Sequence, residues 1–276
     1  MATKISQYLT INEVAQLEQK EKLWLDEILT INNGLPSLNE IWSIMDEVWN
    51  RSDCDKNPTD ENVNTFYSHP VWILNGLFVE KHDESFENRL RFTNWAVSKN
   101  PKLVADYGGG FGSLARMIGS KLPSAQVHII EPHAHPVAVA KASELNNVTY
   151  LKSFDGIYDI MIATDVFEHV PDPLDLLFKT TKFLRTDGLY LIANCFFPVI
   201  QCHLPKCFHL RNSWSSIIKN VGLEFVENIE YGSVFRKSGY ANMARARILE
   251  ERSKKIFKIF KYIPCRIAKP FTEFLL

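Results

Sequence analysis

The chain has 276 residues and a formal net charge of −1, and 46% of its residues are hydrophobic. This length and hydrophobic content suffice for one large globular domain, or for a domain with an appendage. A nearly neutral chain has no overall attraction to nucleic acid, so a nucleic acid partner is not expected. Five cysteines are too few for a disulfide scaffold, and they favour a reducing, cytoplasmic compartment.

The first part of the chain, residues 1–98, has helical rather than strand character. Apolar residues recur at helical spacing over 11–29 and over 38–49, which predicts two amphipathic helices. The segment 66–76 is rich in aromatic residues. It is expected either to pack these helices on a sheet or to form a lid over a ligand, so 1–98 is interpreted as a helical region or lid.

A glycine turn follows the first predicted strand. An apolar run ends in Asp106, and four glycines then precede a helix-like segment: Gly108, Gly109, Gly110 and Gly112. Glycines let the backbone approach a ligand closely because no Cβ intervenes. A carboxylate at Asp106 would repel a diphosphate but attract an ammonium group. Ser113 replaces the third glycine of the pattern Gly-x-Gly-x-x-Gly, which disfavours a nicotinamide dinucleotide.

The next two strands also end in residues suited to a nucleoside. Glu131 and Pro132 follow the run 125–130, about 20 residues beyond the glycines, where an acid accepts hydrogen bonds from ribose hydroxyls. The alternative for Glu131 is a solvated strand end. Phe154 follows the third predicted strand, where it stacks on an adenine or belongs to the core.

A fourth predicted strand, 158–164, ends in Thr164 and Asp165. The string Glu-His-Val-Pro-Asp-Pro begins three residues later with Glu168 and His169 and leads into a proline-bounded helix start. Parallel strands bring such carboxyl ends to one edge of a sheet, where ligands bind.

These three motifs, in this order over residues 100–230, resemble the class I S-adenosylmethionine-dependent methyltransferases. The resemblance implies an α/β fold with a seven-stranded, mostly parallel, doubly wound (Rossmann-like) sheet over 99–240. It also implies S-adenosylmethionine as the cofactor. The residues expected to bind it are Asp106, Gly108, Gly109, Gly110, Gly112, Glu131, Pro132, Phe154, Thr164 and Asp165.

The pattern Asp165-x-x-Glu168-His169 resembles the Glu-x-x-Glu-His of ubiquinone-biosynthesis O-methyltransferases and small-RNA 2′-O-methyltransferases. There these side chains hold a divalent cation that activates the hydroxyl. The resemblance implies Mg²⁺ or another divalent cation on Asp165, Glu168 and His169, although the shorter aspartate loses reach. Alternatively, Glu168 and His169 only start the helix and line the cofactor pocket.

Without a metal, a general base must remove the hydroxyl proton. His169 and His209 are the main candidates, with His203 behind them, and Glu168 is the catalytic carboxylate. A zinc site on Cys202, Cys207, His203 and His209 is one interpretation of this segment, and unpaired thiols are the other. The segment lacks a second pair of zinc ligands, which favours unpaired thiols.

The tail, residues 241–276, is basic. Residues 245–276 contain nine Lys or Arg and three Glu, a net charge of +6, which leaves a net charge of −7 for residues 1–244. The stretch 248–263 is predicted to be an amphipathic helix whose apolar face holds Leu249, Ile256, Ile259, Phe260 and Ile263. Such a helix lies on an anionic membrane, packs on the body, or forms a homodimer.

The expected reaction is O-methylation of a small molecule or a glycan, for example a bacterial surface polysaccharide or a lipid-linked sugar at the membrane's inner face. N- or C-methylation of a small metabolite is the alternative within the family. A non-catalytic binding module with this fold is the alternative from another class, and the intact glycines and acids argue against it.

Overall fold

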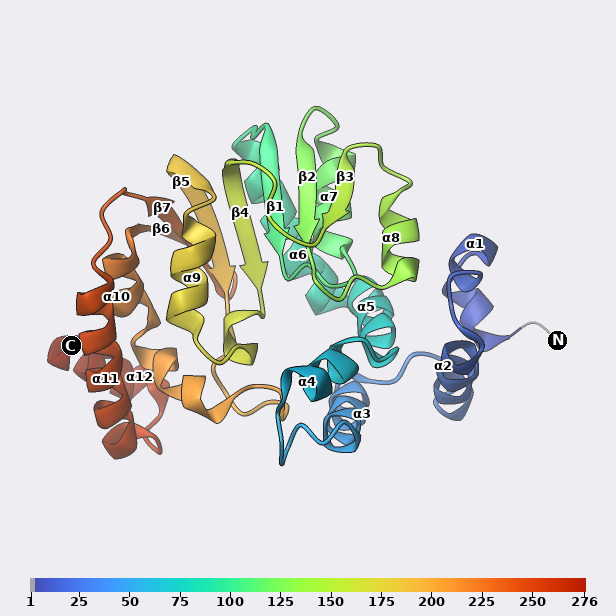
Figure 1. The fold of residues 1–276 in the computed structure, drawn as a ribbon, viewed down its shortest axis with the longest axis horizontal. Helices are drawn as coiled ribbons and strands as arrows, with labels where there is room; N and C mark the ends of the chain where they lie inside the picture. Colours follow the sequence, from blue (N-terminus) through green and yellow to red (C-terminus); the bar gives the residue numbers. More distant parts are fainter. Residues whose placement is uncertain (1–2) are drawn as a thin grey trace. The chain divides into compact units, whose positions relative to one another are not determined.

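The computed structural model describes residues 3–276, which divide into two compact units between Asp155 and Gly156 (Figure 1). Helices of the first unit precede its strands. They are the 3₁₀ helix η1 (Lys4–Gln7), α1 (Ile11–Val14), α2 (Gln19–Ile31), α3 (Leu38–Arg51), α4 (Asp60–Tyr67), α5 (Val71–Lys81) and α6 (Asp83–Ser98). The helical character predicted for this part of the chain is therefore confirmed.

The single helix expected over 11–29 is wrong, because the chain forms two helices there. The carboxylate of Glu21 accepts a 2.7 Å hydrogen bond from the backbone N–H of Glu18, which closes a capping box and starts α2. A second capping box joins Thr10 and Glu13 at the start of α1. Each box satisfies backbone N–H groups that a helix start leaves unpaired, so two short helices replace one long one.

The glycine turn of the first unit lies between a strand and a helix, as predicted. The unit continues with β1 (Leu103–Tyr107), α7 (Ser113–Lys121), β2 (Gln126–Ile130), α8 (Pro136–Ala142) and β3 (Val148–Leu151). β2 pairs in parallel with both β1 and β3. Parallel strands place their carboxyl ends at one edge, so the segments that follow β1, β2 and β3 meet there.

A hydrophobic core joins the N-terminal helices to the glycine turn. Phe111 packs in one cluster with Leu25 and Leu29 of α2 and with Leu74 and Leu77 of α5. A Cβ at position 76 would overlap the Phe111 side chain, so α5 needs a glycine there. The conformation of the turn therefore depends on the helices that precede it.

The second unit holds four strands and the remaining helices. Its elements are β4 (Tyr158–Thr164), η2 (Phe167–His169), α9 (Pro173–Thr181), β5 (Leu184–Ala193), η3 (Pro205–Asn212), α10 (Trp214–Ile218), η4 (Lys219–Val221), β6 (Leu223–Ile229), β7 (Gly232–Lys237), α11 (Met243–Phe260) and α12 (Cys265–Leu275). β4 and β5 pair in parallel, whereas β7 is antiparallel to both β5 and β6.

The seven strands have the order β3-β2-β1-β4-β5-β7-β6. This is a mostly parallel sheet in which β6 and β7 add the antiparallel pairs, so the predicted Rossmann-like α/β fold is confirmed.

The basic tail forms two helices rather than one. α11 ends at Phe260, and Pro264 directly precedes α12. Within residues 3–276 no helix combines the length and the apolar character needed to cross a bilayer.

Candidate active site

Two glycines of the turn are required by close contacts. A Cβ on Gly109 would lie 2.7 Å from Asp106 Oδ2, and a Cβ on Gly112 would lie 2.6 Å from Tyr150 Oη. Gly112 also has a φ of 75°, which side chains rarely adopt. The Tyr150 hydroxyl in turn donates a 2.9 Å hydrogen bond to the carbonyl of Gly110. The turn is thus held tightly around the end of β1.

Asp106 is a buried carboxylate, 2% exposed, at the centre of this turn. Its Oδ1 has no hydrogen-bond partner among the described residues. Burial raises the pKa of Asp106 to about 7, the charge of Glu131 adds to the rise, and Arg89 opposes it. A buried acceptor without a donor is costly, so a ligand with a donor or a positive charge would be stabilised there.

Glu131, directly after β2, is held by two backbone donors. Its Oε2 accepts a 3.1 Å hydrogen bond from the N–H of Gly110, and its Oε1 accepts one of 3.0 Å from the N–H of His133. Pro132, between Glu131 and His133, is exposed. The carboxylate is therefore oriented by the glycine turn itself, which the view of Glu131 as a merely solvated strand end does not explain.

An aromatic pair joins the last residue of β1 to the segment after β3. Phe154 stacks on Tyr107 with ring centroids 5.4 Å apart and planes 6° apart. Both side chains are half-buried. Sequence reasoning identified Phe154 but missed Tyr107, whose place between Asp106 and the first glycine was the available signal.

In the second unit, Glu168 is fully buried in the 3₁₀ turn η2 after β4. Its Oε1 accepts a 2.6 Å hydrogen bond from the N–H of Cys195, and its carbonyl accepts one of 2.9 Å from Leu204. Oε2 has no partner among the described residues. Burial raises the pKa of Glu168 to about 8, with the charge of Asp165 as the second cause. This residue ties the exits of β4 and β5 together and keeps one oxygen available.

Two histidines lie beside Glu168. Nδ1 of His169 is 3.1 Å from the carbonyl of Cys202, and Nδ1 of His203 is 2.7 Å from the carbonyl of Phe197. Since a carbonyl only accepts, each Nδ1 carries the proton and each Nε2 carries the lone pair. Burial and the neighbouring His203 lower the pKa of His169 to about 3, so the ring is neutral.

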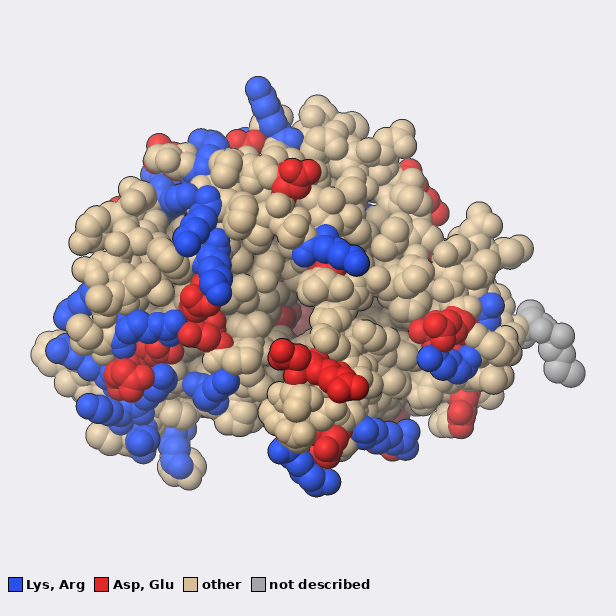
Figure 2. Space-filling view, in the orientation of Figure 1, with Lys and Arg blue, Asp and Glu red and all other residues tan. Residues whose placement is uncertain are grey.

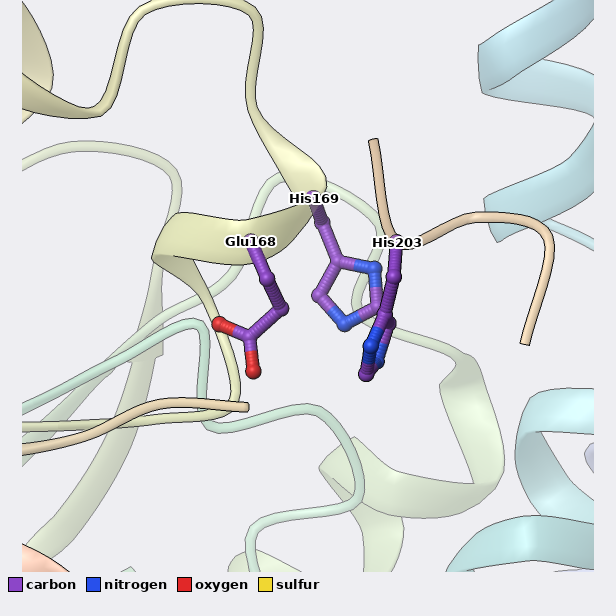
Figure 3. Close-up of side chains that lie close together, drawn as sticks. All are labelled: Glu168, His169 and His203. Atoms are coloured by element: carbon purple, nitrogen blue, oxygen red, sulfur yellow. The ribbon is translucent and has the colours of Figure 1, made fainter. Parts of the chain in front are cut away.

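Ligand atoms of Glu168, His169 and His203 all lie within 4.8 Å of one another. Figure 3 shows the three side chains directed to the same side of the chain segments that carry them. We call these three residues the Glu-His-His cluster. Among the described residues it is the group of His, Cys, Asp and Glu that is suited to a metal ion.

Asp165, expected in this group, is not part of it. Its Oδ2 accepts a 3.2 Å hydrogen bond from the hydroxyl of Tyr231, and its φ is 54°, which turns the chain sharply after β4. Thr164 is the last residue of β4. The third member of the cluster is His203, whereas the sequence pattern predicted Asp165.

The zinc set considered in the sequence does not assemble within residues 3–276. Cys207 Sγ lies 3.4 Å from the carbonyl of Val170, and none of the five cysteines forms a disulfide. Only His203 of that set joins a group suited to a metal ion.

His209 is buried in η3 and contacts α11 rather than the Glu-His-His cluster. Its Nδ1 lies 3.0 Å from Ser253 Oγ, and Ser253 Oγ is also 2.7 Å from Ser213 Oγ. Burial and the charge of Lys254 lower the pKa of His209 to about 4. These contacts connect the segment after β5 to the C-terminal helix.

Sequence reasoning also missed polar groups that follow β5. Both side-chain amide atoms of Asn194 are buried without a hydrogen-bond partner among the described residues, as is Trp214 Nε1. The Trp214 ring packs against Phe167 and Phe196, with centroids 5.4 and 5.3 Å apart. Buried groups of this kind normally have partners, so they point to a polar ligand. An asparagine directly after an apolar strand was the signal.

Comparisons with known proteins agree with this geometry. A family model described as a methyltransferase domain matches residues 77–247. The ubiquinone biosynthesis O-methyltransferase of Ralstonia nicotianae is 26% identical over 201 residues, covering 66% of this chain and 77% of that protein. Its counterpart from Erwinia tasmaniensis is 28% identical over 169 residues, 56% of this chain and 62% of that protein. An O-methyltransferase family protein from Burkholderia thailandensis has a similar fold, with a TM-score of 0.52 and 12% identity over 74% of this chain and 71% of that one.

Proposed function

The chain belongs to the methyltransferase-domain family and is a class I S-adenosylmethionine-dependent methyltransferase, and we propose that it methylates a hydroxyl oxygen of a small molecule or a glycan. The observation that carries this proposal is the Glu-His-His cluster. A hydroxyl is a weak nucleophile until its proton is removed, and the cluster offers groups that can remove it. An amine acceptor would have less need of such a cluster.

The first unit has the groups that S-adenosylmethionine requires. Asp106 would receive the ammonium group, and Glu131 would accept hydrogen bonds from the ribose hydroxyls. The aromatic face of Phe154, supported by Tyr107, would stack on the adenine. We propose further contacts of this unit with the cofactor at Gly108, Gly109, Gly110, Gly112 and Pro132.

Methyl transfer requires the acceptor oxygen, the methyl carbon and the sulfur to lie in line. Nε2 of His169 would accept the acceptor O–H proton, and S-adenosylmethionine would supply the methyl group to the acceptor oxygen and leave as S-adenosylhomocysteine. The Cys202 carbonyl fixes the proton of His169 on Nδ1, so Nε2 is the ring atom that would act as the base. Asn194 and Trp214 would hydrogen-bond the acceptor, because their buried polar atoms have no partner among the described residues.

The same cluster also fits a divalent cation, because Glu168 Oε2 lacks a hydrogen-bond partner among the described residues and two imidazoles lie near it. Glu168, His169 and His203 would be the ligands. Two nitrogen ligands suit Mn²⁺ or a similar transition metal better than Mg²⁺, which prefers oxygen. Such an ion would lower the pKa of a hydroxyl bound to it.

An acceptor screen tests the proposal. Purified protein is incubated with S-adenosylmethionine and with phenols, free sugars, lipid-linked sugars, surface polysaccharide or amines, and S-adenosylhomocysteine is measured. The expected result is turnover with a hydroxyl compound and a product that carries an O-methyl group by mass spectrometry and NMR. A methyl group found on nitrogen or carbon would contradict the oxygen acceptor.

A further inference from the structure

The last helix, α12, exposes an apolar stripe. Ile267, Phe271 and Phe274 are 48%, 56% and 87% exposed, and their spacing of four and three residues places them on one face of the helix. Ala268 and Thr272 on another face are buried. The helix is therefore seated on the second unit by its small residues and presents its large apolar side chains outward.

The end of α11 extends this stripe. Phe260 stacks on Phe271 with ring planes 7° apart, which holds the two helices together. Ile259 and Tyr262 nearby in the chain are 73% and 86% exposed. We call the five exposed residues the C-terminal apolar surface: Ile259, Tyr262, Ile267, Phe271 and Phe274. Exposed large apolar residues grouped in this way mark an interaction site.

This surface differs from the apolar face that the sequence predicted. Leu249 is buried, and the preceding part of α11 is joined to the second unit by the contacts between Ser253 and His209. The first turns of α11 thus pack on the body through Leu249 and Ser253, whereas large apolar side chains at the end of the tail are exposed.

Unpaired lysines accompany the C-terminal apolar surface. Lys255, Lys258 and Lys269 are exposed and make no ion pair among the described side chains. By contrast, Lys254 is paired with Glu250 and Glu251. Figure 2 shows Lys and Arg side chains gathered over the region of α11 and α12. Apolar and positively charged groups therefore share one part of the surface.

We propose that this surface binds the interface of an anionic bilayer, with α12 lying in the membrane plane. An 11-residue helix is too short to span a bilayer, but its aromatic and aliphatic side chains can enter the headgroup region while the lysines contact lipid phosphates. A second copy of the chain is a poorer partner, because each tail has a net charge of +6 and two such tails would repel each other. The docking does not depend on which acceptor is methylated.

A vesicle assay with the full chain tests the charge contribution. Protein is sedimented with phosphatidylcholine vesicles that contain or lack phosphatidylglycerol, at low and high salt and without cofactor. Binding is expected only with the anionic lipid, and it should weaken with salt. The triple variant Lys255→Gln, Lys258→Gln and Lys269→Gln should lose about fivefold in affinity per lysine. The matched control is Lys56→Gln, Lys81→Gln and Lys152→Gln, three exposed lysines of the first unit.

A second pair of variants tests the apolar contribution. Tyr262→Ser with Phe274→Ser should weaken binding at least tenfold, whereas Ile11→Ser with Leu23→Ser, two exposed apolar residues of the first unit, should not. Equal binding by both pairs would overturn the proposal. So would a dimer in sedimentation velocity that only the tail variants dissociate, because the surface would then be a contact between copies. Neither outcome affects methyl transfer, which is measured separately.

Discussion

The N–H of Gly110 donates a 3.1 Å hydrogen bond to Oε2 of Glu131, so the glycine turn after β1 and the acid after β2 form one unit. A carboxylate held by backbone donors is fixed in direction before any ligand arrives. Ribose hydroxyls would then find both an oriented acceptor and a backbone shaped to receive the rest of the nucleoside.

Replacing Glu131 should therefore weaken cofactor binding without unfolding the protein. Glu131→Ala is expected to cost about 1–3 kcal/mol in the free energy of S-adenosylhomocysteine binding, because a charge-assisted hydrogen bond is lost. Isothermal calorimetry measures it. Glu144→Ala, an exposed glutamate of the same unit, is the matched control and should bind normally. Unchanged affinity in Glu131→Ala would remove this residue from the site.

Cofactor affinity should depend on pH through Asp106. Because burial raises the pKa of this carboxyl to about 7, it is largely protonated at pH 6, and affinity for the cationic ammonium should rise as the pH increases through about 7. Calorimetry across this range should show the rise in the wild-type protein and a weak, nearly flat response in Asp106→Asn.

The stability of the ligand-free protein should change in the opposite direction. A raised pKa means that the folded state binds the proton more tightly than the unfolded state. The contribution of Asp106 to the free energy of unfolding is therefore complete below about pH 4 and is lost as the pH rises through about 7. Urea unfolding at several pH values gives the change of the free energy of unfolding with pH, and this slope is compared between the wild type and Asp106→Asn. Identical slopes would contradict the raised pKa.

Chelation and substitutions in the Glu-His-His cluster should distinguish a metal-assisted reaction from a metal-free one. If a cation is held, EDTA should abolish turnover, Mn²⁺ should restore it better than Mg²⁺, and His203→Ala should lose Mn²⁺ binding by calorimetry. Full turnover in EDTA would leave His169 as the base, and His169→Ala should then lower kcat about 10²–10⁴-fold.

His209 is predicted to act on stability rather than on the reaction. Its buried contact with Ser253 joins η3 to α11, so His209→Ala should lower the free energy of unfolding by about 1–3 kcal/mol. In the folded fraction, kcat should fall less than tenfold. A loss of 10²-fold or more with normal stability would instead restore His209 as the general base.

The sheet and the acids at its strand ends were predictable because their signals are local. Acids and glycines directly after apolar runs mark strand ends, and parallel pairing then brings those ends together. Asp106, Glu131 and Glu168 were all identified in this way.

His203 and the C-terminal apolar surface were not predictable to the same degree. His203 reaches Glu168 through the path of the segment after β5, and no spacing in the sequence encodes that path. The tail had helical periodicity throughout, but which face is buried depends on the Ser253 contact with His209, which lies 44 residues earlier. The capping box of Glu18 and Glu21 was a local signal that the helical periodicity over 11–29 obscured.

The position of Phe111 in the core of the N-terminal helices has a consequence for local unfolding. A cofactor that stabilises the glycine turn also stabilises the helices packed on Phe111, because their opening would remove part of its surroundings. Protease sites such as Lys20 and Lys22 in α2 should become more resistant when the cofactor binds. The segment before the first strand is then a reporter of site occupancy, although no residue of it needs to touch the ligand.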